Sequence, residues 1–173
     1  MNVLKYRAMQ NYKHTFIIVL TIVAVLMGYE LLRRKVGSFA GSYPFAEKWT
    51  IAAPLDSVKN AIVKLKNSDP MLFPAQDVLQ FDIDHTGHYS KVDFYYEDSQ
   101  QIVKTLLRER KSGETTLTLV EFEKSENGEL KKMNRDFNYF DNRKEIKKFE
   151  RLIYDEIIEK LNGSATQSRT KAP

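Results

Sequence analysis

The sequence predicts an α+β protein that is held in a membrane by one N-terminal helix. Three observations predict this class: an uncharged apolar run near the N-terminus, strand-like alternation with polar turns in the middle of the chain, and an amphipathic helical pattern on each side of that middle part. The 173 residues are enough for one ordinary domain besides the apolar helix. The absence of cysteine excludes disulfides, thiol catalysis and cysteine-ligated zinc.

The apolar run covers residues 15–32 and fits a membrane-spanning helix. As a helix it is about 27 Å long, close to the ~30 Å hydrocarbon core of a bilayer. It lies between a basic N-terminal flank, residues 1–14, and a juxtamembrane linker, residues 33–46. The membrane-flanking basic residues are Lys13, Arg33, Arg34 and Lys35. A cleaved signal peptide would need a small-residue site directly after the run, and a buried core helix would normally carry a polar stripe. We therefore expect a single-pass anchor whose partner is the lipid bilayer.

The net charge of +4 belongs to the flanks of this helix. Residues 1–35 hold six basic residues and one acidic residue, whereas the rest of the chain holds 21 basic and 22 acidic residues. A nucleic-acid-binding domain needs a basic face, so we expect no nucleic-acid partner. The basic residues on the two sides of the run are nearly equal in number. A short basic N-terminus before an apolar run is the form of a signal anchor, so we expect the domain outside the cytoplasm.

A soluble domain is expected over residues 47–162. It opens with a strand at residues 48–53, and Pro54 then suits the first turn of a helix that ends before Pro70. The apolar stripe of this helix is Leu55, Val58, Ile62 and Leu65. About five strand-like segments follow as an antiparallel meander: residues 79–83, 92–96, 102–110, 115–124 and 130–140.

A long C-terminal helix completes the domain and is expected to pack on a curved sheet. Asn142, with Glu145 three residues later, resembles a capping box at its start. Its apolar stripe is Ile146, Phe149, Ile153, Ile157 and Leu161. Asn162-Gly163 is expected to end it, and residues 163–173 read as a disordered tail.

The segment WTIAAPLDSVKNAIVKL, residues 49–65, and the helix expected over residues 142–161 resemble elements of the START-like (SRPBCC) helix-grip superfamily. The resemblance covers most of residues 47–161, although that superfamily usually has six strands after its opening helices and we count five. It implies a cavity between sheet and long helix that holds an apolar ligand, and it carries over no catalytic residue. The implied lining is Phe81, Phe94, Phe122 and Phe149. The alternative, which a small domain favours, is that these side chains fill the core.

Two polar clusters are candidates for a site. The first is Asp82, Asp84, His85 and His88, where two carboxylates face one side of a strand and two imidazoles flank a turn. Such groups bind zinc, manganese or iron, but they also suit an exposed strand that ends in a polar hairpin. The second is the basic cluster Arg108, Arg110 and Lys111. It fits anionic lipid headgroups, or else a solvated surface paired with Glu109 and Glu114.

The sequence contains none of the familiar catalytic patterns, neither a phosphate-binding glycine-rich loop nor a nucleophile elbow. We therefore expect a membrane-anchored, non-enzymatic binding or interaction domain without a cofactor. Its ligand would be a protein partner at the envelope or an apolar small molecule. The alternatives are an anchored enzyme that uses the Asp/His cluster, and a structural scaffold that pairs through an exposed strand edge.

Overall fold

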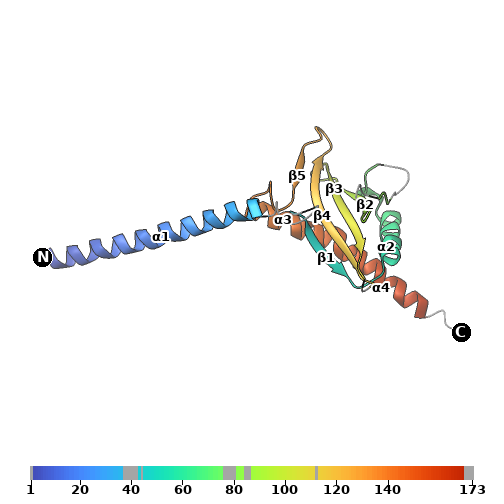
Figure 1. Cartoon of the computed structure of the whole chain (residues 1–173), viewed down its shortest axis with the longest axis horizontal. Helices are drawn as coiled ribbons and strands as arrows, with labels where there is room; N and C mark the ends of the chain where they lie inside the picture. The colour runs from blue at the N-terminus through green and yellow to red at the C-terminus, as the bar shows by residue number, and fades with distance from the viewer. Residues whose placement is uncertain are drawn as a thin grey trace.

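The computed structural model describes residues 2–36, 43, 45–75, 81–83, 87–111 and 113–169. It consists of a long N-terminal helix, α1 (Asn2–Val36), and an α+β domain (Figure 1). The domain follows the order β1 (Glu47–Ile51), α2 (Leu55–Ser68), a short 3-10 helix η2 (Pro70–Leu72), β2 (Ser90–Tyr96), β3 (Gln101–Glu109), β4 (Thr115–Lys124), β5 (Leu130–Lys132), α3 (Tyr139–Phe149), a π-helical turn η3 (Glu150–Tyr154) and α4 (Asp155–Arg169). The predicted α+β class is confirmed.

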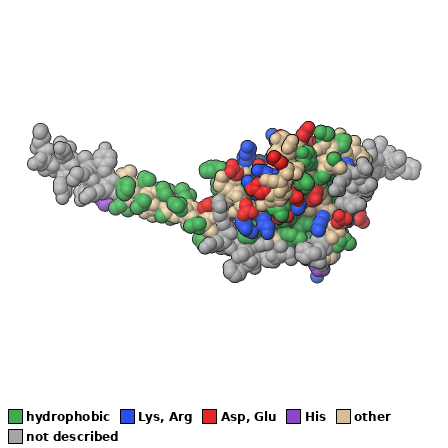
Figure 2. All heavy atoms as spheres, turned by 90° about the horizontal axis from the view of Figure 1, so that it is seen from above, with side chains coloured by type: hydrophobic (Ala, Val, Ile, Leu, Met, Phe, Trp, Pro, Cys, Tyr) green, Lys and Arg blue, Asp and Glu red, His purple; other side chains and the backbone are tan. Residues whose placement is uncertain are grey.

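Helix α1 contains a stretch that is long and apolar enough to cross a membrane, His14–Leu32. Its large apolar side chains are exposed, from 46% at Val23 to 68% at Phe16, and Figure 2 shows this green surface beside a domain of mixed charge. The side chain of Thr21, a polar residue within the stretch, donates to the Ile17 carbonyl at 2.8 Å, so its hydroxyl needs no water. The buried-core-helix interpretation is wrong, because this stretch is not buried.

The helix is longer than the sequence predicts. It continues to Val36, so the basic residues Arg33, Arg34 and Lys35 belong to its last turns and not to a linker. Lys13 lies on the same helix, before the apolar stretch. Most of the expected linker, residues 37–42 and 44, lies outside the described residues.

The sheet is antiparallel, with five strands in the order β1-β4-β3-β2 and with β5 also paired to β4. The turn at Asn127-Gly128 joins β4 and β5 as predicted, and Gly128 adopts the left-handed φ of +66° that the turn needs. The prediction of a strand at residues 79–83 is wrong for the described residues 81–83, which form only an isolated bridge between Ile83 and Ser90. The last predicted strand stops at Lys132, because the main-chain N–H of Lys132 binds the Asp136 carboxylate and closes a turn.

The C-terminal helix begins and ends elsewhere than predicted. Asn138, not Asn142, is the N-cap, and its side chain accepts a hydrogen bond from the main-chain N–H of Asp141 at 2.9 Å. Asn142 is buried and pairs with Asn134 instead. The helix also passes through the expected stop at Asn162-Gly163 and reaches Arg169. The expected disordered tail is therefore helical up to that residue.

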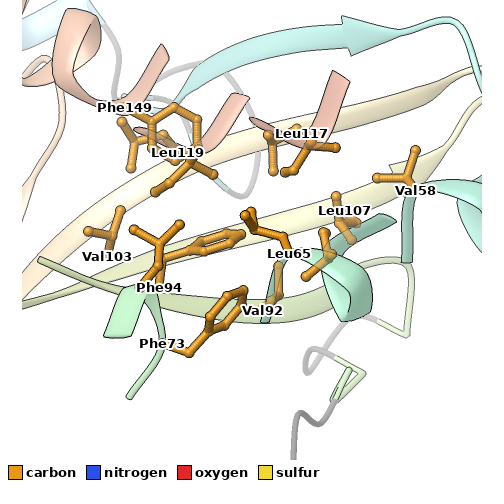
Figure 3. Close-up of a cluster of buried hydrophobic side chains, with 14 of the residues drawn as sticks. Val58, Leu65, Phe73, Val92, Phe94, Val103, Leu107, Leu117, Leu119 and Phe149 are labelled. Carbon is orange, nitrogen blue, oxygen red and sulfur yellow. The ribbon is translucent and has the colours of Figure 1, made fainter. Parts of the chain in front are cut away.

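The core lies between one face of the sheet and the helices α2 and α3–η3–α4 (Figures 1 and 3). Both predicted apolar stripes are confirmed, since their central members are buried: Val58, Ile62, Leu65, Phe149, Ile153 and Ile157. Aromatic rings fill the remaining space. The rings of Trp49 and Phe149 stack with centroids 4.8 Å apart, and those of Phe73 and Phe94 lie 5.1 Å apart.

Candidate binding groove on the outer face of the sheet

The predicted metal cluster is only partly described. Asp84 and His85 lie outside the described residues, while Asp82 and His88 are both exposed. The carbonyl of Asp82 accepts a hydrogen bond from the main-chain N–H of Lys91 at 2.6 Å, which holds the segment against β2. Among the residues that the structure describes, no three acidic or histidine side chains are close enough to hold a metal ion.

The four phenylalanines that the resemblance places around a ligand cavity are part of the core. Phe94, Phe122 and Phe149 are buried, and Phe81 packs against their cluster. Phe122 also contacts the rings of Tyr96 and Phe137, with centroids 6.1 Å and 5.5 Å away. These contacts fit the core-filling alternative better than a ligand cavity.

An open groove of about 810 Å³ lies on the other face of the sheet, which the helices leave uncovered. We call it the outer-face groove. Because side chains alternate along a strand, the residues opposite the core on three neighbouring strands share this face. Strand pairing places Thr50 beside Thr116 and Thr116 beside Arg108. Among the described residues, its lining is Lys48, Thr50, Tyr89, Arg108, Glu109, Arg110, Lys111, Glu114, Thr116 and Thr118.

Two guanidinium groups give the groove its binding capacity. Arg108 lies over the ring of Tyr89, 5.4 Å from its centroid, and donates to the tyrosine hydroxyl at 3.4 Å. Arg110 donates to Thr50 at 3.4 Å and lies 3.8 Å from the Glu114 carboxylate. These contacts are long for hydrogen bonds and ion pairs, so both groups can still bind a carboxylate or phosphate through two parallel N–H donors.

A buried hydroxyl without a partner faces the same groove. Thr118 is only 2% exposed, and its Oγ1 has no hydrogen-bond partner among the described atoms. A buried polar group in this state costs about 1–3 kcal/mol of stability. Because Oγ1 is closed to solvent, the hydrogen-bonding capacity that a ligand in the groove could use comes from the long contacts of Arg108 and Arg110.

Replacing Thr118 with valine is expected to raise the free energy of unfolding by about 1 kcal/mol, because the shape is kept and the unpartnered hydroxyl is removed. Urea denaturation of the full chain in detergent micelles, followed by Trp49 fluorescence, measures this change. Thr105→Val is the matched control. The Thr105 hydroxyl is also buried but donates to the Val92 carbonyl at 2.7 Å, so that variant is expected to lose stability. A loss in Thr118→Val would contradict the assignment.

A second polar cluster joins α3 to the turn between β2 and β3. The ammonium group of Lys148 lies 4.0 Å from the centroid of the Tyr96 ring and binds the Asp98 carboxylate at 2.6 Å and 2.8 Å. This hydrogen bond lowers the pKa of the Asp98 carboxyl. Burial raises the pKa of the Tyr96 phenol and of the Glu145 carboxyl, and an oxygen of each has no hydrogen-bond partner in the described structure.

Glu145→Gln is expected to raise the stability at pH 7. The carboxyl has a higher pKa in the folded state than its ordinary value of 4.5, so the folded chain holds this proton more tightly than the unfolded chain does. At pH values above the pKa, ionisation of Glu145 therefore lowers the stability of the folded chain. This loss disappears at lower pH, where the carboxyl is protonated in both the folded and the unfolded state. Urea midpoints should differ between wild type and variant at pH 7 and converge below pH 4.5. Equal midpoints at both values would contradict the raised pKa.

Arg108, Arg110 and Lys111 of the groove are a cluster in the sequence, whereas nothing in the local pattern indicates its threonines, Lys48 or Tyr89. The alternation of Thr116 and Thr118 with apolar residues places both on one strand face. Their position beside Thr50 and Arg108 depends on the pairing of β4 with β1 and with β3. β1 is far from β4 in the sequence, so no local pattern shows this pairing. Comparison with known proteins finds no family model and no curated protein that matches this chain.

Proposed function

We propose that the protein is a single-pass, membrane-anchored, non-enzymatic binding domain, and that its outer-face groove binds an acidic segment of a protein partner. The observation that carries this proposal is the pair Arg108 and Arg110, both exposed and held only by long contacts in one open groove. Helix α1 supplies the anchor. The helix-grip relationship stays a proposal about the fold, supported by the long C-terminal helix against the sheet.

The size and charge of the groove favour a peptide segment. A volume of about 810 Å³ is in the range of pockets that hold a drug-sized molecule, and therefore several side chains. Its lining has four basic and two acidic side chains, so its net charge attracts carboxylates. Threonine hydroxyls and the Tyr89 hydroxyl add neutral hydrogen-bonding groups, which suit the main chain and polar side chains of a bound segment.

A binding role fits the chemistry of the groove better than catalysis. Its described lining holds no histidine beside a hydroxyl, and its acidic members Glu109 and Glu114 lie among cations on the open surface. A serine- or threonine-based nucleophile needs a base within hydrogen-bond reach. The anchored-enzyme alternative would require the residues around Asp82 and His88, of which these two are exposed.

The proposed compartment is the extracytoplasmic side of the membrane, with the partner in the envelope. Protease treatment of intact cells tests this side directly. Digestion of the domain before lysis supports it, and protection until lysis would place the domain in the cytoplasm.

The ligand is tested with the full chain in zwitterionic nanodiscs and a fluorescent peptide of alternating glutamate and serine. Fluorescence anisotropy should show saturable binding that weakens as salt rises, and a peptide with glutamine for glutamate should not bind. Arg108→Gln with Arg110→Gln should reduce the affinity at least tenfold. Arg135→Gln with Arg151→Gln makes the same change of charge at exposed sites outside the groove and should leave it unaltered.

Two further outcomes would overturn the proposed ligand. One is equal loss of binding in both arginine pairs, since charge alone would then explain the affinity. The other is displacement of the peptide by an equal concentration of inorganic phosphate, which would identify a phosphate group as the ligand.

A further inference from the structure

Two exposed aromatic side chains mark the beginning of α3. Phe140 is 80% exposed and Tyr139 is 44% exposed, and their rings meet edge to face with centroids 5.5 Å apart. Most other large apolar side chains of the domain lie in the core or against it. Exposure alone does not set this pair apart, since Ile83 and Met71 are also more than half exposed, but its position next to the apolar stretch of α1 does.

These two residues lie beside the end of the candidate membrane span. Residues 138–141 and the α1 residues Leu26, Tyr29 and Glu30 line a common hollow of about 780 Å³. The α1 residues belong to the last turns of the stretch that is apolar enough to cross a bilayer. A bilayer that surrounds α1 to this depth therefore also reaches Phe140, and Figure 1 shows α3 next to this end of the helix.

The charges around the pair suit a lipid surface. Arg143 and Lys144 are exposed within the next turn of α3, and Arg143 donates to the hydroxyl of Tyr139 at 3.2 Å. Two acidic residues, Asp141 and Glu30, line the same hollow, and Asp141 is engaged at the helix start through its contacts with Asn138. Aromatic residues beside basic residues are typical of segments that lie in the headgroup layer, where cations meet anionic lipids.

We infer that Tyr139, Phe140, Arg143 and Lys144 form a membrane-contact edge. This edge inserts its aromatic rings into the headgroup layer of the same bilayer that α1 spans. It gives the domain a second point of attachment, independent of the outer-face groove and its ligand. With two attachments the domain holds one orientation on the membrane surface and does not rotate freely about its linker.

Site-directed fluorescence tests the contact in the full chain. Because the chain has no cysteine, a single Tyr139→Cys substitution carries one environment-sensitive NBD label. Val63→Cys is the control, since Val63 is an exposed apolar residue of α2. Figure 1 shows α2 on the side of the domain away from α1. Both chains are placed one copy per nanodisc, in phosphatidylcholine with phosphatidylglycerol and doxyl-labelled lipid.

The label at position 139 is expected to be quenched at least twice as strongly by doxyl lipid as the label at position 63, and less by aqueous iodide. Adding Phe140→Asp to the Tyr139→Cys chain should remove that difference. Equal quenching at both positions would overturn the inference. So would protection at position 139 that appears only in vesicles with many copies, because a second copy of the chain and not lipid would then cover the edge.

Discussion

Phe149→Ala is expected to lower the free energy of unfolding by about 3–5 kcal/mol, the range for truncation of a buried aromatic side chain. Phe149 is 0% exposed, and Trp49 of β1 stacks on its ring. The same indole donates to the Glu150 carboxylate at 3.1 Å, so one contact surface joins the first strand to the C-terminal helix. Alanine leaves a cavity at this junction, which the sheet and helix can close only by moving toward each other against the rest of the packed core. Urea denaturation of the full chain in micelles, followed by circular dichroism, measures the loss.

Phe149→Leu is the control for this prediction. Leucine keeps most of the apolar volume and is expected to cost clearly less, because the cavity is smaller. The fluorescence of Trp49, the single tryptophan, should shift toward the red in the alanine variant as water reaches the indole. A loss below about 1 kcal/mol in Phe149→Ala would contradict the described packing and leave room for the ligand cavity that the helix-grip resemblance implies.

Asn142→Ala is expected to lower the free energy of unfolding by about 2–3 kcal/mol, because it removes two hydrogen bonds that a buried side chain makes with Asn134. The side chain of Asn142 accepts from the main-chain N–H of Asn134 at 2.8 Å and donates to the Asn134 side chain at 2.7 Å. Asn134 has a left-handed φ of +56° and in turn donates to the Phe45 carbonyl and the Glu47 carboxylate. Loss of the Asn142 side chain therefore loosens the links between α3, the turn that holds Asn134 and the start of β1.

Asn60→Ala is the matched control, since Asn60 is exposed on α2 and its loss should change stability little. Hydrogen exchange gives a second readout. The main-chain amides at the start of β1 should exchange faster in Asn142→Ala but not in Asn60→Ala. Unchanged exchange near Glu47 together with a large loss of stability would show that Asn142 acts only within its own helix.

The periodic parts of the fold could be predicted from the sequence. The apolar stripes of α2 and of the C-terminal helix have helical spacing, and the side chains of β2 alternate between core and surface as expected. The spacing of apolar residues in the C-terminal helix also fits the π-helical turn. Steps of four residues from Phe149 to Ile153 and Ile157 overshoot each α-helical turn by about 40°, and a wider turn absorbs part of this drift.

The helix boundary shows where local patterns mislead. Asn142 with Glu145 has the spacing of a capping box, and Asn138 with Asp141 offers another cap one turn earlier. Tertiary contacts decide between them, because only Asn142 is placed to bind Asn134. Asn162-Gly163 likewise resembles a stop, but the described helix passes through it. Local sequence preference does not decide a helix boundary where contacts with neighbouring segments stabilise another one.

The groove could be predicted only in part for the same reason. Three of its described basic residues, Arg108, Arg110 and Lys111, are near neighbours in sequence, so the sequence alone indicates them as a cluster. Thr50 joins them through the pairing of β1 with β4 across more than sixty residues, a register that no local pattern contains. The exposed position of Phe140 was hidden because its segment was expected to be a strand, and in the structure it begins a helix.

The way β1 meets β4 determines how the domain carries mechanical load. Tension between the membrane and a partner in the groove would pass from α1 through Phe45 and Glu47 into β1. β1 runs antiparallel to β4 from the pair Glu47–Leu119 to the pair Ile51–Thr115, so a pull along the strand stretches its hydrogen bonds together in shear. Side-chain bonds fasten both ends, from Asn134 at one and from the Thr115 hydroxyl to the Ala53 carbonyl at the other. These side-chain bonds therefore add to the main-chain hydrogen bonds of β1 that would resist such a pull.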